Sequence, residues 1–301
     1  MSKFIISIIG PTAIGKTALS IKLAQYFKTE IISADSRQFF KEMQIGTAAP
    51  SNEELTAAKH HFIHHKSIHD KYNVGAFEKD AIIRLNELFK IHNVVIMVGG
   101  SGLYVDAVTK GLDDFPEVDK KIRETLNTDF QTKGLEYLQS QLKALDLKSY
   151  ETIAIYNPHR VIRALEICIG TGKPYASFLY KRKEKRDFKT ITIGLTAKRD
   201  LIYNRINKRV DLMMETGLLD EVKSLEAYQN LNALNTVGYK ELFNYLNGAW
   251  TLDFAISEIK KNTRRFAKRQ LTWFKRNHET LWFDYAEESD NIIKHLETLI
   301  T

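Results

Sequence analysis

One residue type is almost missing from this chain of 301 residues, because Cys168 is its only cysteine. A single cysteine excludes an internal disulfide and any cysteine-based zinc site, and Cys168 is expected to be structural. No apolar run approaches about 18 residues, so no segment is predicted to span a membrane. Internal repeats and low-complexity tracts are also absent, and the one short charge run, KRKEKR at 181–186, is expected to face solvent. Location in the cytoplasm is the expectation that fits these absences.

The totals leave room for a substantial core and a charged partner. A hydrophobic content of 44% in 301 residues is enough for one large or two modest domains. The formal net charge is +7, and the calculated pI is about 9.2. A moderate positive excess favours a polyanion such as RNA, although many basic proteins bind no nucleic acid.

Short apolar runs rich in Ile and Val predict buried parallel strands. They lie at 4–9, 31–34, 94–98 and 191–195, and the run 281–285 is a candidate fifth strand. Between the first two, TALSIKLAQYF at 17–27 has apolar residues at helical spacing. A strand, a helix and a second strand make a βαβ unit, so we predict an α/β fold with a doubly wound parallel sheet.

The segment GPTAIGKT at 10–17 matches the phosphate-binding pattern G-x-x-x-x-G-K-[ST] without a mismatch, between the first strand and the helix. Gly10 and Gly15 allow tight turns, so that loop N–H groups point at phosphate oxygens. Lys16 neutralises charge, the helix N-terminus adds its dipole, and the Thr17 hydroxyl can bind Mg²⁺. The residues expected to bind phosphate are Gly10, Pro11, Thr12, Ala13, Ile14, Gly15, Lys16 and Thr17.

About ninety residues separate the third and fourth predicted strands, which is far too long for one crossover. Apolar residues recur there at helical spacing, as in Leu135, Leu138 and Leu142, and 158–169 is a second helical pattern. We therefore predict a mostly helical insertion at 113–189, between 1–112 and 190–301, which form the P-loop core with a helical C-terminal part. From Asp200 onward the chain is predicted to be helical almost throughout, with a break at Gly248.

A carboxylate is missing where an ATPase usually has one. Such enzymes place an acid at the end of a later hydrophobic strand, where it holds Mg²⁺ and organises water. The strand VVIMV at 94–98 instead runs into Gly99-Gly100-Ser101-Gly102. This absence weakens a motor-ATPase interpretation and leaves a small-molecule kinase open.

The second strand ends in Asp35-Ser36-Arg37-Gln38. Ligands of open α/β sheets lie beyond the carboxyl ends of the strands, where the phosphate loop also lies, so Asp35 is expected to face that loop. It is a candidate general base or metal ligand, and the alternative is an N-cap for a following helix. Ser101, beyond the third strand, reaches the same edge and can donate a hydrogen bond to a phosphate.

The motifs together resemble the bacterial tRNA dimethylallyltransferase family. GPTAIGKT at 10–17 and DSRQFFKEMQIGTAAP at 35–50 resemble its P-loop and its DSxQ…IGTAKP segment. Further matches are HHFIH at 60–64, YNVGAF at 72–77, VGGSGLY at 98–104, NPHRVIRALEICIGTGKP at 157–174, YNRINKRVDLM at 203–213, TVGYKEL at 236–242 and TRRFAKRQLTWFKR at 263–276. The resemblance covers nearly the whole chain and is far more specific than the P-loop alone.

The resemblance implies transfer of a dimethylallyl group from dimethylallyl diphosphate to the exocyclic amine of the adenosine just 3′ of the anticodon. Asp35 would accept the amine proton, Ser101 would assist, and the P-loop with Mg²⁺ at Thr17 would hold the departing diphosphate. The insertion would contact the anticodon stem-loop of tRNA, and we expect a monomer. The residues that the resemblance places against tRNA are Asp35, Ser36, Arg37, Gln38, Ser101, Arg123, His159, Arg160, Val161, Ile162 and Arg163.

The chain departs from the family pattern at a few positions. Ser101 stands where threonine is more common, which keeps the hydroxyl. Phe39-Phe40 replaces an aliphatic–tyrosine pair, and Ala49 replaces a lysine. Asn73 and Gly75 replace a serine and an alanine. None of these changes affects the P-loop or Asp35.

Five histidines at 60–69 could suggest a metal site: His60, His61, His64, His65 and His69. Zinc sites need convergent ligands, whereas adjacent histidines point in different directions on a helix or a strand, so a metal is not predicted there.

Two arginine pairs lie at helical spacing. Arg160 and Arg163 either form a surface pair with Glu166 or bind RNA, and the resemblance favours RNA. Arg205 and Arg209 present two guanidinium groups on one side of a helix and are assigned to the diphosphate. The alternative for this second pair is a solvated face, or an ion pair with Asp211 or Glu215.

A basic stripe lies in the helix predicted near 258–276. Its i,i+4 rows are Lys260, Arg264 and Lys268, then Lys261, Arg265 and Arg269, with Glu258 as the one acid. Like charges at this spacing repel, so the stripe favours contact with phosphates, to which we assign Lys268 and Arg269. The alternative is a solvated basic face.

Two other functions stay open at this point. A small-molecule or nucleotide kinase shares the P-loop and a helical lid but has no use for the basic stripe. A non-catalytic RNA-binding protein explains the charge but gives no role to GPTAIGKT or Asp35.

Overall fold

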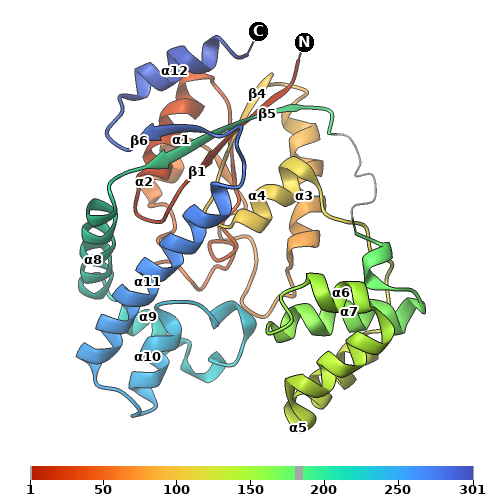
Figure 1. The fold of residues 1–301 in the computed structure, drawn as a ribbon. Helices are drawn as coiled ribbons and strands as arrows, with labels where there is room; N and C mark the ends of the chain where they lie inside the picture. Colours follow the sequence, from red (N-terminus) through yellow and green to blue (C-terminus); the bar gives the residue numbers. More distant parts are fainter. Residues whose placement is uncertain (1, 180–185, 301) are drawn as a thin grey trace. The chain divides into compact units, whose positions relative to one another are not determined.

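The computed structural model describes residues 2–179 and 186–300 (Figure 1). The chain divides into two compact units. The core unit comprises Met1–Lys110 and Arg186–Thr301, and the inserted unit comprises Gly111–Lys185. Within the described ranges, no helix combines the length and the apolar character that crossing a membrane requires.

The core unit contains one sheet of six strands, all paired in parallel, in the order β3-β2-β4-β1-β5-β6. The strands are β1 (Phe4–Ile9), β2 (Ile31–Ser33), β3 (His60–His61), β4 (Val94–Val98), β5 (Lys189–Thr196) and β6 (Leu281–Asp284). The four predicted strands and the candidate fifth are thereby confirmed, and β3 is an addition. Because all strands are parallel, their carboxyl ends meet at one edge.

Helices cover both faces of this sheet. All helices of the core unit, in chain order, are α1 (Lys16–Tyr26), α2 (Asn52–Ala57), α3 (Val74–Leu88), α4 (Gly102–Lys110), α8 (Arg199–Glu215), α9 (Leu218–Ser224), α10 (Tyr239–Leu246), α11 (Leu252–Phe274) and α12 (Ser289–Glu297), of which α9 and α10 pack with α8 and α11 rather than with the sheet. Short 3₁₀ helices η2 (Glu226–Tyr228) and η3 (Asn232–Leu234) follow α9.

The alternation of side chains along β1 sets the two layers of the core. Phe4, Ile6 and Ile8 pack with side chains of α1, α8 and α12, whereas Ile5 and Ile9 pack with α3 and α4. Figure 1 shows α1 with α12 on one side of the sheet and α3 with α4 on the other. Each fully buried Ile or Leu contributes about 1.5–3 kcal/mol to this packing.

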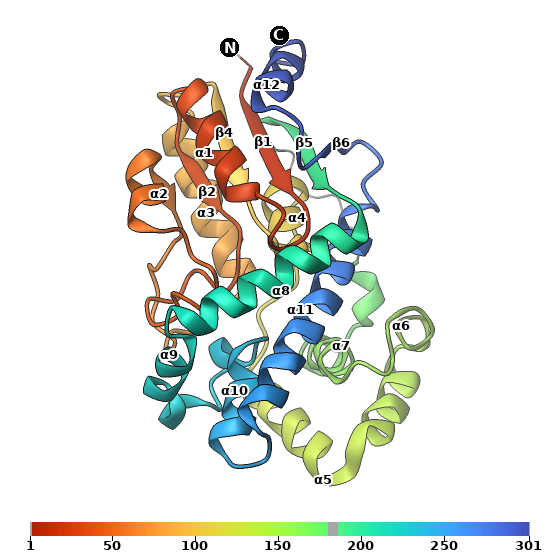
Figure 2. The same ribbon diagram turned by 90° about the vertical axis from the view of Figure 1, so that its left-hand side faces the viewer.

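The C-terminal helices form a third apolar cluster with the segment that follows β2. Phe40 and Met43 pack there against Tyr239, Leu242 and neighbours from α8 to α11. The helices α8 and α11 lie side by side beyond the arrowheads of β1 and β5 (Figure 2). The predicted break at Gly248 is confirmed, since this residue has φ 75° between α10 and α11.

The inserted unit is helical, as predicted. It contains α5 (Lys120–Leu145), α6 (Leu147–Thr152), α7 (Pro158–Thr171) and the 3₁₀ helix η1 (Tyr175–Ser177). Leu126, Leu138 and Leu142 of α5 pack against the apolar face of α7, which also buries Cys168. Val161 and Ile162 lie in this core with 0% and 3% of their surfaces exposed, so their side chains serve the packing of α7, and the contact of these two residues with tRNA stays a prediction.

Arg186 corrects the interpretation of the charge run KRKEKR. Residues 181–185 of the run lie outside the described residues, but Arg186 does not face open solvent as predicted. Its guanidinium donates to the carbonyl oxygens of Val108 at 3.0 Å and Ala107 at 2.8 Å, near the C-terminus of α4, and forms an ion pair with Glu78. A cation at the end of a helix satisfies carbonyl groups that have no partner within the helix.

Candidate active site

The phosphate loop occupies the turn between β1 and α1, as predicted. Gly10 has φ 144°, and a Cβ atom there would lie 2.6 Å from the carbonyl oxygen of Leu195 on β5. Gly15 has φ 109° and stands at the N-terminus of α1. The Lys16 ammonium donates to the carbonyl oxygen of Pro11 at 2.8 Å, so it lies across the loop. These features produce the loop shape that binds phosphate in other proteins.

The two arginines of α8 lie against this loop. Arg205 Nε donates to the carbonyl oxygen of Ala13 at 2.7 Å, and Arg209 Nη1 lies 3.4 Å from Thr12 Oγ1. In the described ranges neither arginine forms an ion pair with Asp211 or Glu215. Asp211 instead pairs with Lys260 at 2.5 Å. The geometry agrees with the assignment of these arginines to the diphosphate, which stays a prediction.

Two adjoining cavities of about 600 Å³ and 420 Å³ lie at this edge of the core unit. The larger, the loop cavity, is lined by the phosphate loop with Gln44, Glu54 and His60. The smaller, the helix cavity, is lined by Ser36, Ser101 and residues of α8, α10 and α11. The residues that line both are Thr12, Lys16, Asp35, Thr47, Ala48, Gly100, Arg209 and Met213. Lys16 and Asp35 thus stand where two differently lined cavities meet.

Asp35 is held in a turn rather than at the start of a helix. Its Oδ1 accepts a hydrogen bond from the backbone N–H of Arg37 at 3.1 Å, and the next helix along the chain, α2, begins only at Asn52. The N-cap alternative is therefore wrong. Burial raises the pKa of Asp35 above its usual range, while the N–H of Arg37 and the charge of Lys16 act in the opposite direction. A desolvated carboxylate of this kind is a stronger base than one in water.

Lys16 is the cation that faces Asp35. Burial lowers the pKa of Lys16 to about 8, and the negative charge of Asp35 opposes this shift. A diphosphate beside this buried ammonium would add negative charge to that of Asp35 and would stabilise the charged form of Lys16 further. The electrostatics therefore suit an anionic ligand in the loop cavity.

The residues near Asp35 form hydrogen bonds with the segments that line the two cavities. Ser101 Oγ accepts from the backbone N–H of Ser36 and lies 3.1 Å from its hydroxyl oxygen, so its observed partner is the turn after β2. Arg37 donates to the carbonyl oxygens of Asn232 and Ala233 at 2.9 and 3.0 Å. Gln38 donates to the carbonyl oxygen of Ala48 at 3.0 Å. The contacts of these residues with RNA stay predictions, while the bonds observed in the structure are internal.

Sequence reasoning missed Gln270 of α11. Its Oε1 accepts from the backbone N–H of Thr12 and its Nε2 donates to the carbonyl oxygen of Gly100, both at 2.8 Å. A Cβ atom at Gly100 would lie 2.5 Å from Gln270 Nε2 and 3.5 Å from Asp35 Oδ2. One buried amide therefore links the phosphate loop to the loop beside Asp35.

Replacing Gln270 with methionine is expected to lower kcat, because the side chain keeps its length but loses both bonds. Two unpaired buried backbone groups cost about 1–3 kcal/mol each, which loosens the spacing between Lys16 and Asp35. Gln270→Glu keeps the acceptor for Thr12 and loses the donor to Gly100. If the spacing matters, kcat falls in both variants at a temperature at which both are still folded, although their melting temperatures also fall. Equal kcat in wild type and Gln270→Met would contradict this role.

A second residue without a sequence signal is Glu221 of α9. Its carboxylate accepts from the backbone N–H groups of Gln44, Ile45 and Gly46 at 2.7–3.0 Å and from the Tyr239 hydroxyl at 2.6 Å. These bonds fix the segment that walls both cavities. Only the three-dimensional fold brings this acid to residues more than 170 positions away.

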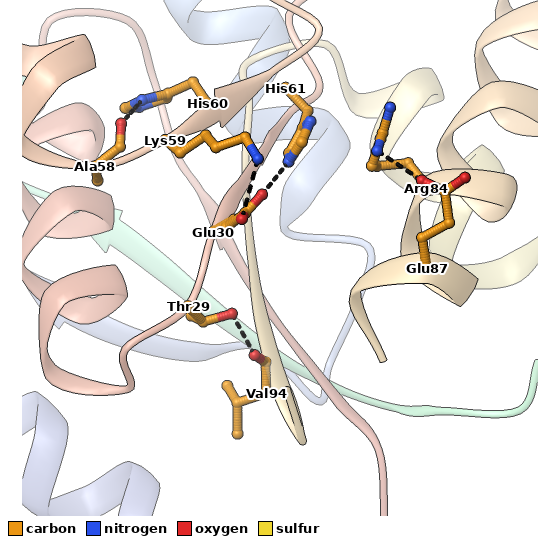
Figure 3. Close-up of polar contacts among 9 residues, drawn as sticks. All are labelled: Thr29, Glu30, Ala58, Lys59, His60, His61, Arg84, Glu87 and Val94. Carbon is orange, nitrogen blue, oxygen red and sulfur yellow. Dashed lines mark hydrogen bonds and ion pairs between the residues drawn. The ribbon is translucent and has the colours of Figure 1, made fainter. Parts of the chain in front are cut away.

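The histidines at 60–69 make separate contacts, of which Figure 3 shows those of His60 and His61. His61 Nε2 lies 2.5 Å from Glu30 Oε2, whereas His60 Nδ1 donates to the carbonyl oxygen of Ala58 at 2.7 Å. His65 packs among aromatic rings, and burial lowers its pKa to about 4. In the part of the chain that the structure describes, no group of three or more His, Cys, Asp or Glu side chains is arranged to hold a metal.

The basic stripe of α11 is only partly free for a ligand. Lys260 pairs with Asp211, Lys261 pairs with Glu258, and Arg264 donates to Asn207 at 2.8 Å. These three cations therefore interact with neighbouring protein groups. Lys268 and Arg269, by contrast, are exposed and form no ion pair within the described residues, and Arg269 also lines the helix cavity.

In the inserted unit, Arg123 and Arg163 both pair with the carboxylate of Glu166, at 2.9 and 2.8 Å. For Arg163, the structure therefore shows the ion pair with Glu166 that was the alternative to RNA binding. His159 and Arg160 are exposed in the first turn of α7, after the N-cap Asn157. The N-terminus of this helix and its basic side chains could attract a phosphate.

Comparison with known proteins decides the family. A sequence model described as IPP transferase matches residues 38–277. A tRNA dimethylallyltransferase of Christiangramia forsetii is 62% identical over 300 residues, which cover 100% of this chain and 99% of that protein. The tRNA dimethylallyltransferase 1 of Bacteroides fragilis is 48% identical over 99% of both chains. The chain belongs to the IPP transferase family.

Solved structures of similar proteins agree with this membership. The full-length tRNA isopentenylpyrophosphate transferase of Bacillus halodurans is 37% identical, with a TM-score of 0.72 over 99% of this chain and 96% of that one. A eukaryotic dimethylallyltransferase, described as acting on tRNA, is 26% identical, with a TM-score of 0.86 over 99% of this chain and 80% of that one. This IPP transferase therefore shares its fold with both bacterial and eukaryotic relatives.

Proposed function

We propose that this IPP transferase is a tRNA dimethylallyltransferase. It transfers the dimethylallyl group of dimethylallyl diphosphate to the N6 amine of the adenosine 3′-adjacent to the anticodon and releases diphosphate. The observation that carries the proposal is the placement of Asp35 and Lys16 where the two cavities meet. The loop cavity takes the diphosphate, and the helix cavity takes the adenosine.

The chemistry requires one new bond, one broken bond and one proton transfer. The N6 nitrogen attacks the allylic carbon that carries the diphosphate, and the C–O bond breaks with its electron pair on the diphosphate. Asp35 accepts the proton that the amine loses, as a general base. Lys16, Arg205, Arg209 and the N–H groups of the phosphate loop bind the leaving diphosphate, whose charge grows as the bond breaks. No water needs to be activated.

The residues present fit a magnesium ion. The Thr17 hydroxyl and the Asp35 carboxylate line the same cavity as the phosphate loop and offer the oxygen ligands that Mg²⁺ prefers. Mg²⁺ commonly binds through one or two protein oxygens together with phosphate oxygens and waters. When bound, the ion would neutralise charge on the diphosphate. We propose Thr17 as its protein ligand.

The exposed cations are the proposed contacts with the anticodon stem-loop. His159 and Arg160 supply them in the inserted unit, and Lys268 and Arg269 supply them on α11. Lysine and arginine on the RNA backbone contribute affinity that falls as salt rises. We further propose that the enzyme acts as a monomer in the cytoplasm.

One assay separates this function from its two rivals. The protein is incubated with radiolabelled dimethylallyl diphosphate and unmodified tRNA, and the label is sought in the RNA. Label in the tRNA, lost when the target adenosine is replaced by guanosine, supports the transferase. Phosphoryl transfer from ATP would support a kinase, and tight RNA binding without transfer would support a non-catalytic RNA-binding protein.

The rate should depend on pH through the pair Asp35 and Lys16. Asp35 must be deprotonated to accept a proton, so kcat/KM falls as the pH drops through its raised pKa. Lys16 must be charged, so kcat/KM also falls as the pH rises through about 8 in the free enzyme. Bound diphosphate raises the pKa of Lys16, so the alkaline limb of kcat lies at higher pH.

Steady-state kinetics across pH test this expectation. In the variant Lys16→Arg the guanidinium keeps its charge, so the alkaline limb is expected to disappear. An alkaline limb that is unchanged in Lys16→Arg would show that another group titrates.

A further inference from the structure

The helix α11 presents one face to the helix cavity. Ile259, Thr263, Phe266 and Gln270 line that cavity and follow one another at intervals of three or four residues, the spacing of one helix face. Ile259 and Gln270 are buried, with 2% and 5% of their surfaces exposed, whereas Phe266 is 37% exposed. The two ends of this face are therefore buried, and the Phe266 ring between them is accessible to a ligand.

Phe266 is the only aromatic side chain among the described residues that line this cavity. The other apolar lining residues are aliphatic, such as Val237 and Met213. Arg269, one turn further along α11, lines the same cavity, and its guanidinium carbon lies 5.7 Å from the centre of the Phe266 ring. An aromatic ring beside an arginine is the pair of planar groups on which unpaired nucleobases stack.

The Phe266 ring and the proposed base Asp35 line the same cavity. Side chains four residues apart on a helix are separated by about 5–6 Å, so Phe266 is one turn from Gln270. Gln270 Nε2 donates to the carbonyl oxygen of Gly100. A Cβ atom added at Gly100 would lie 3.5 Å from Asp35 Oδ2, so Gly100 is next to the proposed base. A purine laid on the Phe266 ring can therefore direct its exocyclic amine toward Asp35.

The charge around the ring fits the rest of a nucleotide. Arg265, Lys268 and Arg269 are exposed around Phe266 on the same helix and form no ion pair in the described parts of the chain. Cations at this place can bind the phosphates on either side of an extruded base. A purely apolar ligand would not interact favourably with these three cations.

We propose that Phe266 is the platform on which the target adenine stacks after it leaves the anticodon loop, with the Arg269 guanidinium beside it. An adenine must be unstacked to expose its amine, and a stacking partner in the enzyme replaces part of the stacking that it loses. This inference rests on the proposed transferase function and adds the residue that holds the acceptor base.

The test compares three variants with a matched control. Phe266→Ala removes the ring, Phe266→Leu keeps apolar volume without aromatic stacking, and Phe266→Tyr keeps the ring. Phe254→Ala is the control, since Phe254 is an exposed aromatic of the same helix, 48% exposed, and does not line the cavity. Kinetics are measured with an anticodon stem-loop RNA and with dimethylallyl diphosphate as the varied substrate in turn.

Loss of one stacked base is expected to raise KM for RNA roughly 5- to 150-fold in Phe266→Ala and Phe266→Leu. KM for dimethylallyl diphosphate should stay unchanged, and Phe266→Tyr and Phe254→Ala should behave like wild type. A stem-loop with 2-aminopurine at the target position adds a direct signal, because stacking quenches its fluorescence. The quenched state should require an aromatic ring at position 266.

Two outcomes would contradict the stacking role of Phe266 and leave the proposed transferase function unaffected. The first is a Phe266→Leu enzyme with wild-type KM for RNA and wild-type quenching. The second is a ring-dependent signal only when 2-aminopurine occupies a neighbouring position. A wild-type enzyme that transfers no label to RNA would instead contradict the proposed function itself.

Discussion

Replacing Asp35 with alanine is expected to lower kcat by about 10²- to 10⁴-fold, the usual contribution of a positioned general base. The carboxylate is the acid that stands between the two cavities, and burial already raises its pKa. The N6 amine of adenosine is a weak nucleophile, because its lone pair is delocalised into the ring. Its proton must therefore depart as the new C–N bond forms, and alanine offers no acceptor.

Single-turnover rates and RNA affinities measured separately check this expectation. RNA affinity should change little, since Lys268 and Arg269 of α11 are untouched. Asp35→Asn is the matched variant, because it keeps the shape and the acceptor for the Arg37 N–H. It should lose about as much rate as Asp35→Ala. A wild-type kcat in either variant would remove Asp35 from the role of base.

Replacing Lys16 with alanine is expected to weaken dimethylallyl diphosphate binding roughly 30- to 5,000-fold, the effect of removing one partner of a buried charge pair. The ammonium is buried and lies across the phosphate loop, where it accompanies Arg205 and Arg209. A diphosphate bound there without it would keep an uncompensated charge. RNA affinity should be unaffected.

Titration calorimetry with dimethylallyl diphosphate measures the effect directly. Lys22→Ala is the control, because Lys22 belongs to the same helix α1 but is exposed and contacts Ser289. Unaltered affinity in Lys16→Ala would count against the phosphate loop as the diphosphate site. A loss of equal size in Lys22→Ala would indicate a general effect on α1.

The sheet and the phosphate loop could be predicted because their signals are local. The long strands β1, β4 and β5 are rich in Ile and Val, and GPTAIGKT lies between a strand and a helix in the sequence as in the structure. The strand β3 could not be predicted, since His60 and His61 are too few for a periodic pattern and pair only with β2.

The residues that hold the site in place by hydrogen bonds could not be predicted, because no pattern of neighbouring residues marks them. Gln270 contacts Thr12 across 258 positions, and Arg37 contacts the segment at 232–235, so neither pairing is visible until the chain has folded. The burial of Val161 and Ile162 was not foreseen for a related reason. They belong to a motif that suggests ligand contact, but a helix has an inner face, and hydrophobic burial decides which residues occupy it.

The strand order also constrains how the enzyme is made. β1 pairs with β4 on one side and with β5 on the other, although the whole inserted unit lies between these two strands in the sequence. During synthesis one edge of the apolar β1 therefore stays without its partner until the insertion has emerged. The arginines of α8 and the inner face of α11 emerge later still. A nascent chain thus carries a complete phosphate loop long before it has an active site, and its ability to bind substrate arises only near the end of translation.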